Sequence, residues 1–368
     1  MSPSRTFFEI PTIDLSLAQS PESKPILLKQ LRHALLSVGF LYITNHGVSD
    51  EVITDLVDVL PKLFSLSDAA KEEIALHNSP HFLGYSNVGA ETTGGKADRR
   101  EQVEFATELN ATYSLGKPLY ERLRGPNQWP SQLPQLKPIV NLYISELTSL
   151  GERFLHLVAE ALSLPPSTFL PFLSDQHRLK LVHYPGSTSS SLALDANTDE
   201  TQGVGPHKDS SGWWTFLLQA SPPSVKGLQV LNKAGTWIDV PNIPGTFVVN
   251  IGQAFEVVTN GVCKATTHRV LTEPGSAERL SVPFFQGVRR DLTKDEAVGT
   301  LRGEFERIAA TESIAGEESE EGLKIDSPFL RGKYETWGES QLRTKVRSHM
   351  DVGRRFYGEV YEMYLNDD

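Results

Sequence analysis

The segment between residues 178 and 290 constrains the fold most, because it consists of short strand-like runs separated by Gly and Pro. Seven runs follow one another at similar spacing: LKLVHY, WTFLLQ, GLQVLN, TWIDV, TFVVNIG, ATTHRVL and RLSVPFF. Evenly spaced short runs rich in β-branched and aromatic residues are typical of a sandwich or barrel such as a jelly roll. We therefore expect a mainly β core in 178–290, flanked by helices.

The rest of the chain divides into three further predicted segments. Residues 1–130 open with a helical pattern that stops at Gly39 and continues into the apolar run FLYIT, which predicts an α/β segment. Within it, residues 80–130 are rich in Gly, Asn and Pro and predict loops. Residues 131–177 predict a long supporting helix, and residues 291–368 predict helices that pack on the core. The stripe of the long helix comprises Ile139, Leu142, Tyr143, Leu150, Phe154, Leu157, Val158 and Leu162.

Charge and cysteine content exclude several classes of protein. The chain has 35 Lys and Arg against 46 Asp and Glu, a net charge of −11, which gives no electrostatic reason to bind nucleic acid or anionic membranes. A single cysteine, Cys263, excludes an internal disulfide framework and a thiolate metal site. The first residues lack a signal-peptide pattern, and no stretch reaches the ~20 apolar residues of a membrane span. We therefore expect a cytoplasmic protein, and a monomer.

Three residues of the β-rich block have the side chains of a metal site. His207 and Asp209 are two positions apart, and His268 follows 61 residues after His207. Two imidazoles and one carboxylate hold Fe(II) while leaving neighbouring coordination positions open, an arrangement suited to oxygen activation. In a strand, residues two apart share a face, so His207 and Asp209 can converge on one ion.

A His-x-acid pattern is common, so it needs support from elsewhere in the chain. Ten histidines and 46 acidic residues among 368 positions give about one such pattern by chance. A second instance exists at His349 and Asp351. It lies on a predicted helix, where residues two apart point about 200° apart and cannot hold one ion.

That support comes from Arg279 and Ser281, eleven and thirteen residues after His268. An Arg fork and a hydroxyl on one face of a strand are what a dicarboxylate requires. Taken alone, an arginine at position 279 more often belongs to an ordinary surface salt bridge.

The motifs taken together resemble a known family. IPTIDLS, GFLYITNHGV, LKLVHYP, HKDSSGWWTFLLQ, PGTFVVNIG, THRV and RLSVPFF occur in the order typical of the isopenicillin N synthase-like group of 2-oxoglutarate/Fe(II)-dependent dioxygenases. The resemblance covers most of the chain, and several motifs in one order are more specific than any one of them. It implies an α+β protein, mainly β, whose core is a double-stranded β-helix, a distorted jelly roll with flanking helices.

The resemblance also implies the reaction and its cofactors. Fe(II), 2-oxoglutarate and O₂ would oxidise a small organic metabolite, for example in secondary metabolism, by hydroxylation, desaturation or cyclisation, with release of succinate and CO₂. Position by position, it implies that iron is held by His207, Asp209 and His268, and the distal carboxylate of 2-oxoglutarate by Arg279, Ser281 and Tyr184.

Two further residues are candidates for contact with substrate. Lys180 shares a strand face with Val182 and Tyr184, although a surface lysine that only covers apolar surface would fit the same pattern. Phe285 lies four residues after Ser281 on the same face, although most buried aromatic residues belong to the core.

The sequence also departs from the family pattern. Val182 stands where the family often has Asn, and Gln253 stands where an Asp commonly follows the NIG motif. The segment 186–205 is long and rich in Ser, Thr and Asp, so we expect a loop that gates access of substrate to the iron.

Two other functions remain open at this point. One is a cyclising oxidase of the same fold that takes all electrons from its substrate and uses no oxoglutarate. The other is a non-catalytic binder of small molecules on a cupin-like barrel, against which three converging metal ligands argue.

Overall fold

The computed structural model describes residues 6–186, 202–210, 212–272, 275–312 and 325–366. Most of the predicted gating loop, residues 187–201, therefore lies outside the described residues. The end of that predicted loop is a strand, since residues 202–205 belong to β8 (Gln202–His207). The prediction of a loop was wrong for this part because β8 is built from small residues and Pro, QGVGPH, without an apolar alternation.

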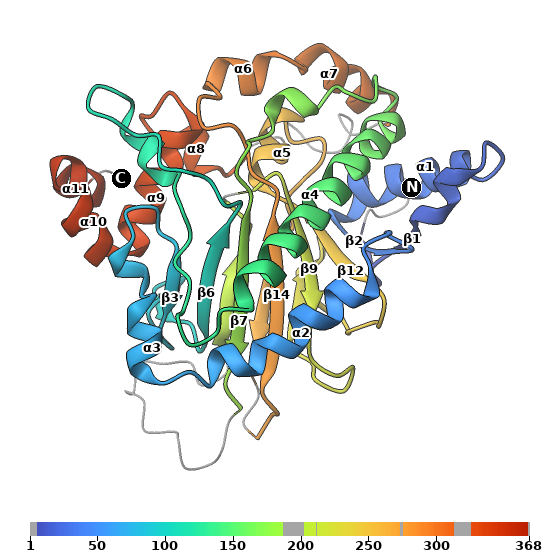
Figure 1. The fold of residues 1–368 in the computed structure, drawn as a ribbon. Helices are drawn as coiled ribbons and strands as arrows, with labels where there is room; N and C mark the ends of the chain where they lie inside the picture. Colours follow the sequence, from blue (N-terminus) through green and yellow to red (C-terminus); the bar gives the residue numbers. More distant parts are fainter. Residues whose placement is uncertain (1–5, 187–201, 211, 273–274, 313–324, 367–368) are drawn as a thin grey trace.

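Two β-sheets form the centre of the molecule (Figure 1). The larger has the strand order β1-β2-β12-β9-β14-β7-β6-β3, and the smaller has the order β11-β10-β13-β8. The strands of the large sheet are β1 (Thr12–Asp14), β2 (Phe40–Thr44), β12 (Phe247–Ile251), β9 (Trp214–Gln219), β14 (Arg279–Phe285), β7 (Arg178–Tyr184), β6 (Glu101–Ala106) and β3 (Gly84–Ser86). In the small sheet, β8 is joined by β11 (Trp237–Asp239), β10 (Leu228–Leu231) and β13 (His268–Leu271). Every one of the seven runs in 178–290 contains a strand, as predicted.

The prediction that residues 80–130 form only loops was wrong. They contain β3, the hairpin of β4 (Thr92–Thr93) and β5 (Lys96–Ala97), and β6, whose six residues are all buried. Strand β6 hydrogen-bonds to β7 along its whole length.

The sequence of β6, EQVEFA, conceals a buried strand because two of its residues are glutamates. Their charges are compensated by residues distant in sequence. The Glu101 carboxylate accepts from Lys71 Nζ at 2.9 Å and pairs with His183 Nδ1 at 2.7 Å. The Glu104 carboxylate pairs with Arg178 and, at 3.0 Å, with Lys345 Nζ. No local pattern could reveal these partners.

The N-terminal segment is part of the same architecture as the β core. Helix α1 (Lys24–His33) continues as a π-helical turn, η2 (Ala34–Val38), which ends at Gly39 with φ +73°. A Cβ at Gly39 would lie 2.4 Å from Thr266 Oγ1, so a glycine is required by space as well as by φ. The chain then enters β2, which pairs with β1 and inserts beside β12.

Two helices cross the outer face of the large sheet, α4 (Leu136–Ala161) and α2 (Asp50–Phe64) (Figure 1). The apolar stripe of α4 enters the main core, where Phe154 packs edge-on against Trp214 and Phe216, with ring centroids 5.3 and 5.7 Å apart. Leu142 is an exception to the predicted stripe, since it is 50% exposed. The long helix therefore supports the sheet from outside, as predicted.

The remaining helices lie around the sheets, and one of them, Gln253–Val258, is buried at all six of its positions. They are α3 (Asp68–Glu73), α5 (Gln253–Val258), α6 (Lys294–Gly299), α7 (Arg302–Thr311), α8 (Pro328–Arg331), α9 (Trp337–Ser348), α10 (Met350–Phe356) and α11 (Gly358–Leu365), together with short 3₁₀ turns η1 (Leu15–Gln19), η3 (Leu76–Asn78), η4 (Leu119–Leu123) and η5 (Leu170–Phe172). The C-terminal helices occur as predicted, but the helix expected across His349 is interrupted there. His349 has φ −134° and separates α9 from α10.

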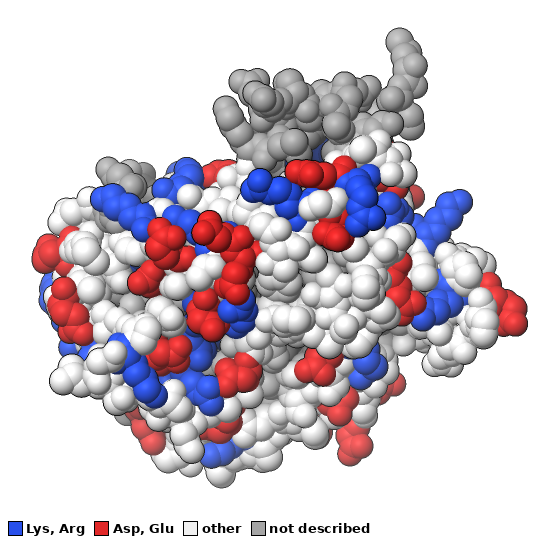
Figure 2. Space-filling view, turned by 90° about the horizontal axis from the view of Figure 1, so that it is seen from above, with Lys and Arg blue, Asp and Glu red and all other residues white. Residues whose placement is uncertain are grey.

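The apolar character of the helices and the distribution of surface charge are two further features of the molecule. Within the described ranges, no helix combines the length and the apolar character that crossing a bilayer requires. On the face shown in Figure 2, acidic and basic side chains are interleaved, without a large patch of one sign.

We predict that Phe154→Ala lowers the free energy of unfolding by about 3–5 kcal/mol, because it leaves a cavity between α4 and the large sheet. Urea denaturation followed by far-UV circular dichroism measures the change. Leu142→Ala on the same helix is the matched control and should stay within about 0.5 kcal/mol of wild type. Equal losses in the two variants would contradict the assigned packing face.

Candidate metal centre and active site

The pairing of β8 with β13 creates the centre of the site by placing His207 directly opposite His268. Asp209 lies two residues beyond the end of β8, and its Oδ1 is 3.6 Å from the Nε2 atom of each histidine. One ligand atom from each residue lies within 4.8 Å of the other two. Among the residues that the structure describes, this is the one group of three or more His, Cys, Asp or Glu able to hold an ion.

Backbone carbonyls orient both imidazoles. Nδ1 of His207 lies 2.8 Å from the Gly205 carbonyl oxygen, and Nδ1 of His268 lies 3.1 Å from that of Thr266. Because a carbonyl only accepts, each Nδ1 must carry the hydrogen and donate it. Each Nε2 is therefore left with a free lone pair, the state that a metal ligand needs.

The carboxylate of Asp209 is braced on its other oxygen. Oδ2 accepts a hydrogen bond from Thr215 Oγ1 at 2.5 Å and another from Asn250 Nδ2 at 2.7 Å. Oδ1 is thus the atom directed at the two histidines. The sequence reasoning missed both donors, although a polar Asn in the middle of the apolar strand FVVNI was a usable signal.

The electrostatics of the cluster favour cation binding. Burial alone would raise the pKa of Asp209, but His268, His207 and the hydrogen bonds to its carboxylate hold that pKa well below its ordinary value. Burial, assisted by the neighbouring His207, lowers the pKa of His268 to about 4. At neutral pH the site therefore presents an ionised carboxylate and a neutral His268, the forms that coordinate a divalent metal.

Arg279, Ser281 and Tyr184 lie together in the same cavity as the metal cluster, which has a volume of about 190 Å³. Arg279 pairs with Tyr184 across β14 and β7, and its guanidinium carbon is 5.0 Å from the centre of the Tyr184 ring. Its Nη2 donates to Gln219 Oε1 at 3.3 Å, whereas its buried Nη1 has no hydrogen-bond partner. A buried guanidinium with an unused donor fits an incoming carboxylate.

Lys180 and Phe285, the candidates for substrate contact, line this cavity too. Lys180 Nζ lies 3.4 Å from Glu91 Oε1 and 3.8 Å from Glu104 Oε2, so it is not a freely solvated surface lysine. Arg100 also lines the cavity and was not singled out from the sequence.

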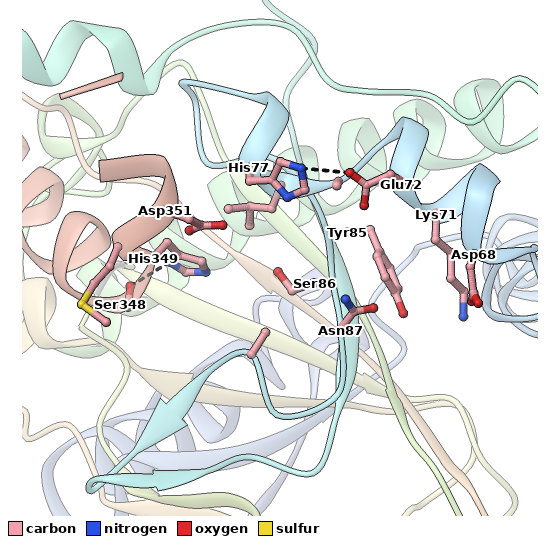
Figure 3. A pocket seen from close by; sticks show the side chains of 14 residues that line it. Asp68, Lys71, Glu72, His77, Tyr85, Ser86, Asn87, Ser348, His349 and Asp351 are labelled. Atoms are coloured by element: carbon pink, nitrogen blue, oxygen red, sulfur yellow. Dashed lines mark hydrogen bonds and ion pairs between the residues drawn. The ribbon is translucent and has the colours of Figure 1, made fainter. Parts of the chain in front are cut away.

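The second His-x-Asp pattern lies beside a different cavity of about 620 Å³ (Figure 3). His349 Nε2 lies 3.2 Å from Glu91 Oε1, and Asp351 Oδ1 accepts a hydrogen bond from the backbone of Val352. These two residues do not form a metal cluster with any third described ligand. The reason given for setting this pattern aside, a continuous helix through both residues, was wrong, because His349 lies between α9 and α10.

Comparison with known proteins decides the family. The model for the 2OG-Fe(II) oxygenase superfamily matches residues 176–288, and the model described as non-haem dioxygenase in morphine synthesis, N-terminal, matches residues 10–132. The chain belongs to the 2OG-Fe(II) oxygenase superfamily.

Individual relatives of this oxygenase agree. It is 41% identical to the 2-oxoglutarate-dependent dioxygenase frbJ of Dothideomycetidae sp. (strain 11243), with 96% of this chain and 94% of that one covered. It is 31% identical to a 2-oxoglutarate-dependent dioxygenase of Gibberella zeae, over 97% and 93% of the two chains. A Neurospora crassa structure in complex with alpha-KG has a TM-score of 0.65 at 25% identity and covers 82% of this chain and 96% of its own. The structure of JOX2 in complex with 2OG, Fe and JA has a TM-score of 0.61 at 26% identity, over 80% and 81% of the chains.

These relationships confirm the predicted fold class, the double-stranded β-helix. They also confirm the enzyme class and its cofactors: the protein is an Fe(II)- and 2-oxoglutarate-dependent dioxygenase that oxidises a small substrate. The fungal relatives from Dothideomycetidae sp. and Gibberella zeae are both named 2-oxoglutarate-dependent dioxygenases, which favours neither predicted alternative, a non-catalytic binder or an oxoglutarate-independent oxidase.

We predict that Asn250→Val weakens Fe(II) binding about 10- to 100-fold, since it removes one of two donors that orient the Asp209 carboxylate. Anaerobic equilibrium dialysis of Fe(II) measures the dissociation constant. Thr246→Val is the matched control, because Thr246 directly precedes the same β-strand and its hydroxyl donates to the Ile243 carbonyl, away from Asp209. Unchanged iron affinity in a folded Asn250→Val protein would show that this amide does not support the metal site.

Proposed function

We propose that Fe(II) binds to Nε2 of His207, Nε2 of His268 and Oδ1 of Asp209. The observation that carries the proposal is the convergence of these three atoms. In each residue the other polar atom of the side chain is engaged in a hydrogen bond, so the converging atom is free to bind a metal. Because the protein supplies three ligands on one side of the ion, further coordination positions of the iron remain open.

We also propose that Arg279, Ser281 and Tyr184 bind the distal carboxylate of 2-oxoglutarate. Arg279 is 3% exposed and Ser281 2%, so a carboxylate would meet them in a site without bulk water. The unused Nη1 of Arg279 supplies a donor for one carboxylate oxygen, and the hydroxyls of Ser281 and Tyr184 can donate as well. Val182, where the family often has Asn, contributes an apolar surface instead.

When bound, iron and 2-oxoglutarate supply the oxidising power from O₂, with succinate and CO₂ as co-products. The side chains supply position and charge. His207, Asp209 and His268 hold the ion, and Arg279 fixes the direction of the cosubstrate. Lys180 and Phe285 then contact a small organic metabolite on the remaining wall of the cavity, and hydroxylation is the proposed outcome, with a role in secondary metabolism.

The direct test is a reaction of the iron-reconstituted enzyme with a panel of small metabolites, scored by succinate release. We expect succinate formation to rise with one class of substrate and to equal the amount of oxidised product. Substrate oxidation without succinate would instead favour the oxoglutarate-independent oxidase.

We further propose that the enzyme is a cytoplasmic monomer that binds neither nucleic acid nor membrane. The acidic net charge of −11 supports this view, as does the interleaving of charges on the face in Figure 2. The chain has a single cysteine, Cys263, and therefore no disulfide within the chain, which is consistent with a reducing compartment.

We predict that Arg279→Lys weakens 2-oxoglutarate binding by about 1.5–3 kcal/mol, because an ammonium keeps the charge but loses the planar fork. Anaerobic titration of the metal-loaded enzyme measures the affinity. Arg269→Lys is the control, since this arginine stacks on Trp237 at 4.0 Å and binds Gln229 away from the cavity. An unchanged oxoglutarate affinity in Arg279→Lys would assign the residue another role.

A further inference from the structure

The charged side chains that line the iron cavity are predominantly cationic. They are Arg100, Lys180, Lys208, Arg279 and the metal ligand Asp209, which is the one carboxylate among the described residues of the lining. Lys208 is neutralised by Glu256, whose two oxygens both lie 3.2 Å from its Nζ. Arg279 is assigned to oxoglutarate, and Arg100 lies beside Tyr184 of the same anchor, so Lys180 remains to be explained.

Arg100 and Lys180 share one counter-ion. Arg100 Nη2 is 2.6 Å from Glu91 Oε2, whereas Lys180 Nζ is 3.4 and 3.5 Å from the two Glu91 oxygens. Gln102 Nε2 also donates to Glu91, at 2.7 Å. The Glu91 carboxylate is therefore held mainly by Arg100 and Gln102, and Lys180 has the weaker contact.

The second carboxylate near Lys180 is also committed to other partners. Glu104 lies 3.8 Å from Lys180, but it pairs more closely with Arg178 and Lys345. Burial alone would raise the pKa of Glu104 and of Glu91, but the surrounding cations hold both pKa values well below their ordinary range. Both carboxylates are thus ionised, and both closer partners of Glu104 bind its Oε1, whereas its Oε2 has no hydrogen-bond partner and lies nearest to Lys180.

Counting the ion pairs of this network gives a surplus of positive charge. Among the described residues, the cations Arg100, Arg178, Lys180 and Lys345 share the carboxylates Glu91, Asp98 and Glu104. Four positive charges thus face three negative ones, and Lys180 is the cavity-lining member with the longest contacts. An additional anion in the cavity would complete the balance.

Lys180 lies near the opposite end of β7 from Tyr184, a residue of the oxoglutarate anchor. It faces the cavity with Val182 and Tyr184, and it lies four positions before Tyr184 on the strand, about 13 Å between the two Cα atoms at 3.2–3.4 Å per residue. The β7–β14 register places Lys180 at the level of Pro283, next to Phe285 on the same face of β14. An ammonium and an apolar surface therefore lie side by side.

We propose that the substrate is a small carboxylic acid whose carboxylate binds Lys180, beside Arg100, while its apolar part lies against Phe285. This inference rests on the proposed function, which assigns Arg279 to oxoglutarate. The arrangement selects an anion over an amine because the cations line the cavity, whereas Glu91 and Glu104 lie behind them. It also explains why the ammonium of Lys180 is retained in a largely buried position, 18% exposed.

The test uses two probes of equal shape and different charge, isobutyrate and isobutyramide. Each is added to the enzyme loaded with Mn(II) and 2-oxoglutarate, and paramagnetic relaxation of its methyl protons is measured by NMR. We expect relaxation enhancement for isobutyrate at least tenfold stronger than for isobutyramide. Equal enhancement for the two probes would overturn the proposal.

Two variants separate direct contact from a general effect of charge. Lys180→Met removes the proposed ligand and leaves Glu91 and Glu104 with their closer partners, so the protein should fold. It should abolish the preference for isobutyrate, and Lys180→Arg should restore it. Lys345→Met is the matched control, because it removes one positive charge from the same network but does not line the iron cavity. It should keep the preference.

The affinity for 2-oxoglutarate in each variant distinguishes the two possible anions. We expect it to change less than twofold in Lys180→Met. If it falls tenfold or more, Lys180 serves the cosubstrate and the proposal is wrong. A preference for isobutyrate that persists in Lys180→Met would also contradict the proposal. Failure of wild-type enzyme to bind 2-oxoglutarate at all would instead refute the proposed function.

Discussion

The antiparallel pairing of β8 with β13 is the constraint on which the active site depends. It sets His207 directly opposite His268, although 61 residues separate them in the chain. Slippage by one residue would turn one imidazole to the other face of the sheet and destroy the cluster. The two backbone carbonyls that orient the rings belong to the same strand ends, so pairing and ligand direction are set together.

A second pairing, between β7 and β14, sets the rest of the cavity wall. Its register brings Arg279 to Tyr184 and Ser281 to Val182, and the next cavity-facing positions are Lys180 and Pro283. Along β7 and β14, the cavity wall therefore passes from the residues proposed to bind oxoglutarate to those proposed to contact the substrate. Strand β6 completes it from the other side of β7 with ionised glutamates that keep the buried cations in place.

Local patterns were sufficient for much of this structure. Short runs rich in β-branched and aromatic residues, separated by Gly and Pro, located the seven strands. Lys180, Tyr184, Ser281 and Phe285 all line the iron cavity. Alternation was insufficient where the partners are distant in sequence. Strand β6 was missed because its glutamates meet Lys71 and Lys345 only in the folded chain.

The same limit applies to the site. Asp209 converges on the histidines from a position just beyond β8, so its bracing by Thr215 and Asn250 could not be read from strand alternation. The break at His349 was also missed, because the apolar spacing continues across it while the backbone does not. For Asp209 the deciding partners lie on other strands, β9 and β12.

Crystallography of the enzyme with Fe(II) and 2-oxoglutarate, using anomalous scattering at the iron edge, tests the central claim most directly. The account predicts a single iron peak within coordination distance of His207 Nε2, His268 Nε2 and Asp209 Oδ1, and a carboxylate of oxoglutarate on Arg279 Nη1. An iron peak at any other residues, or oxoglutarate bound away from Arg279, would contradict it.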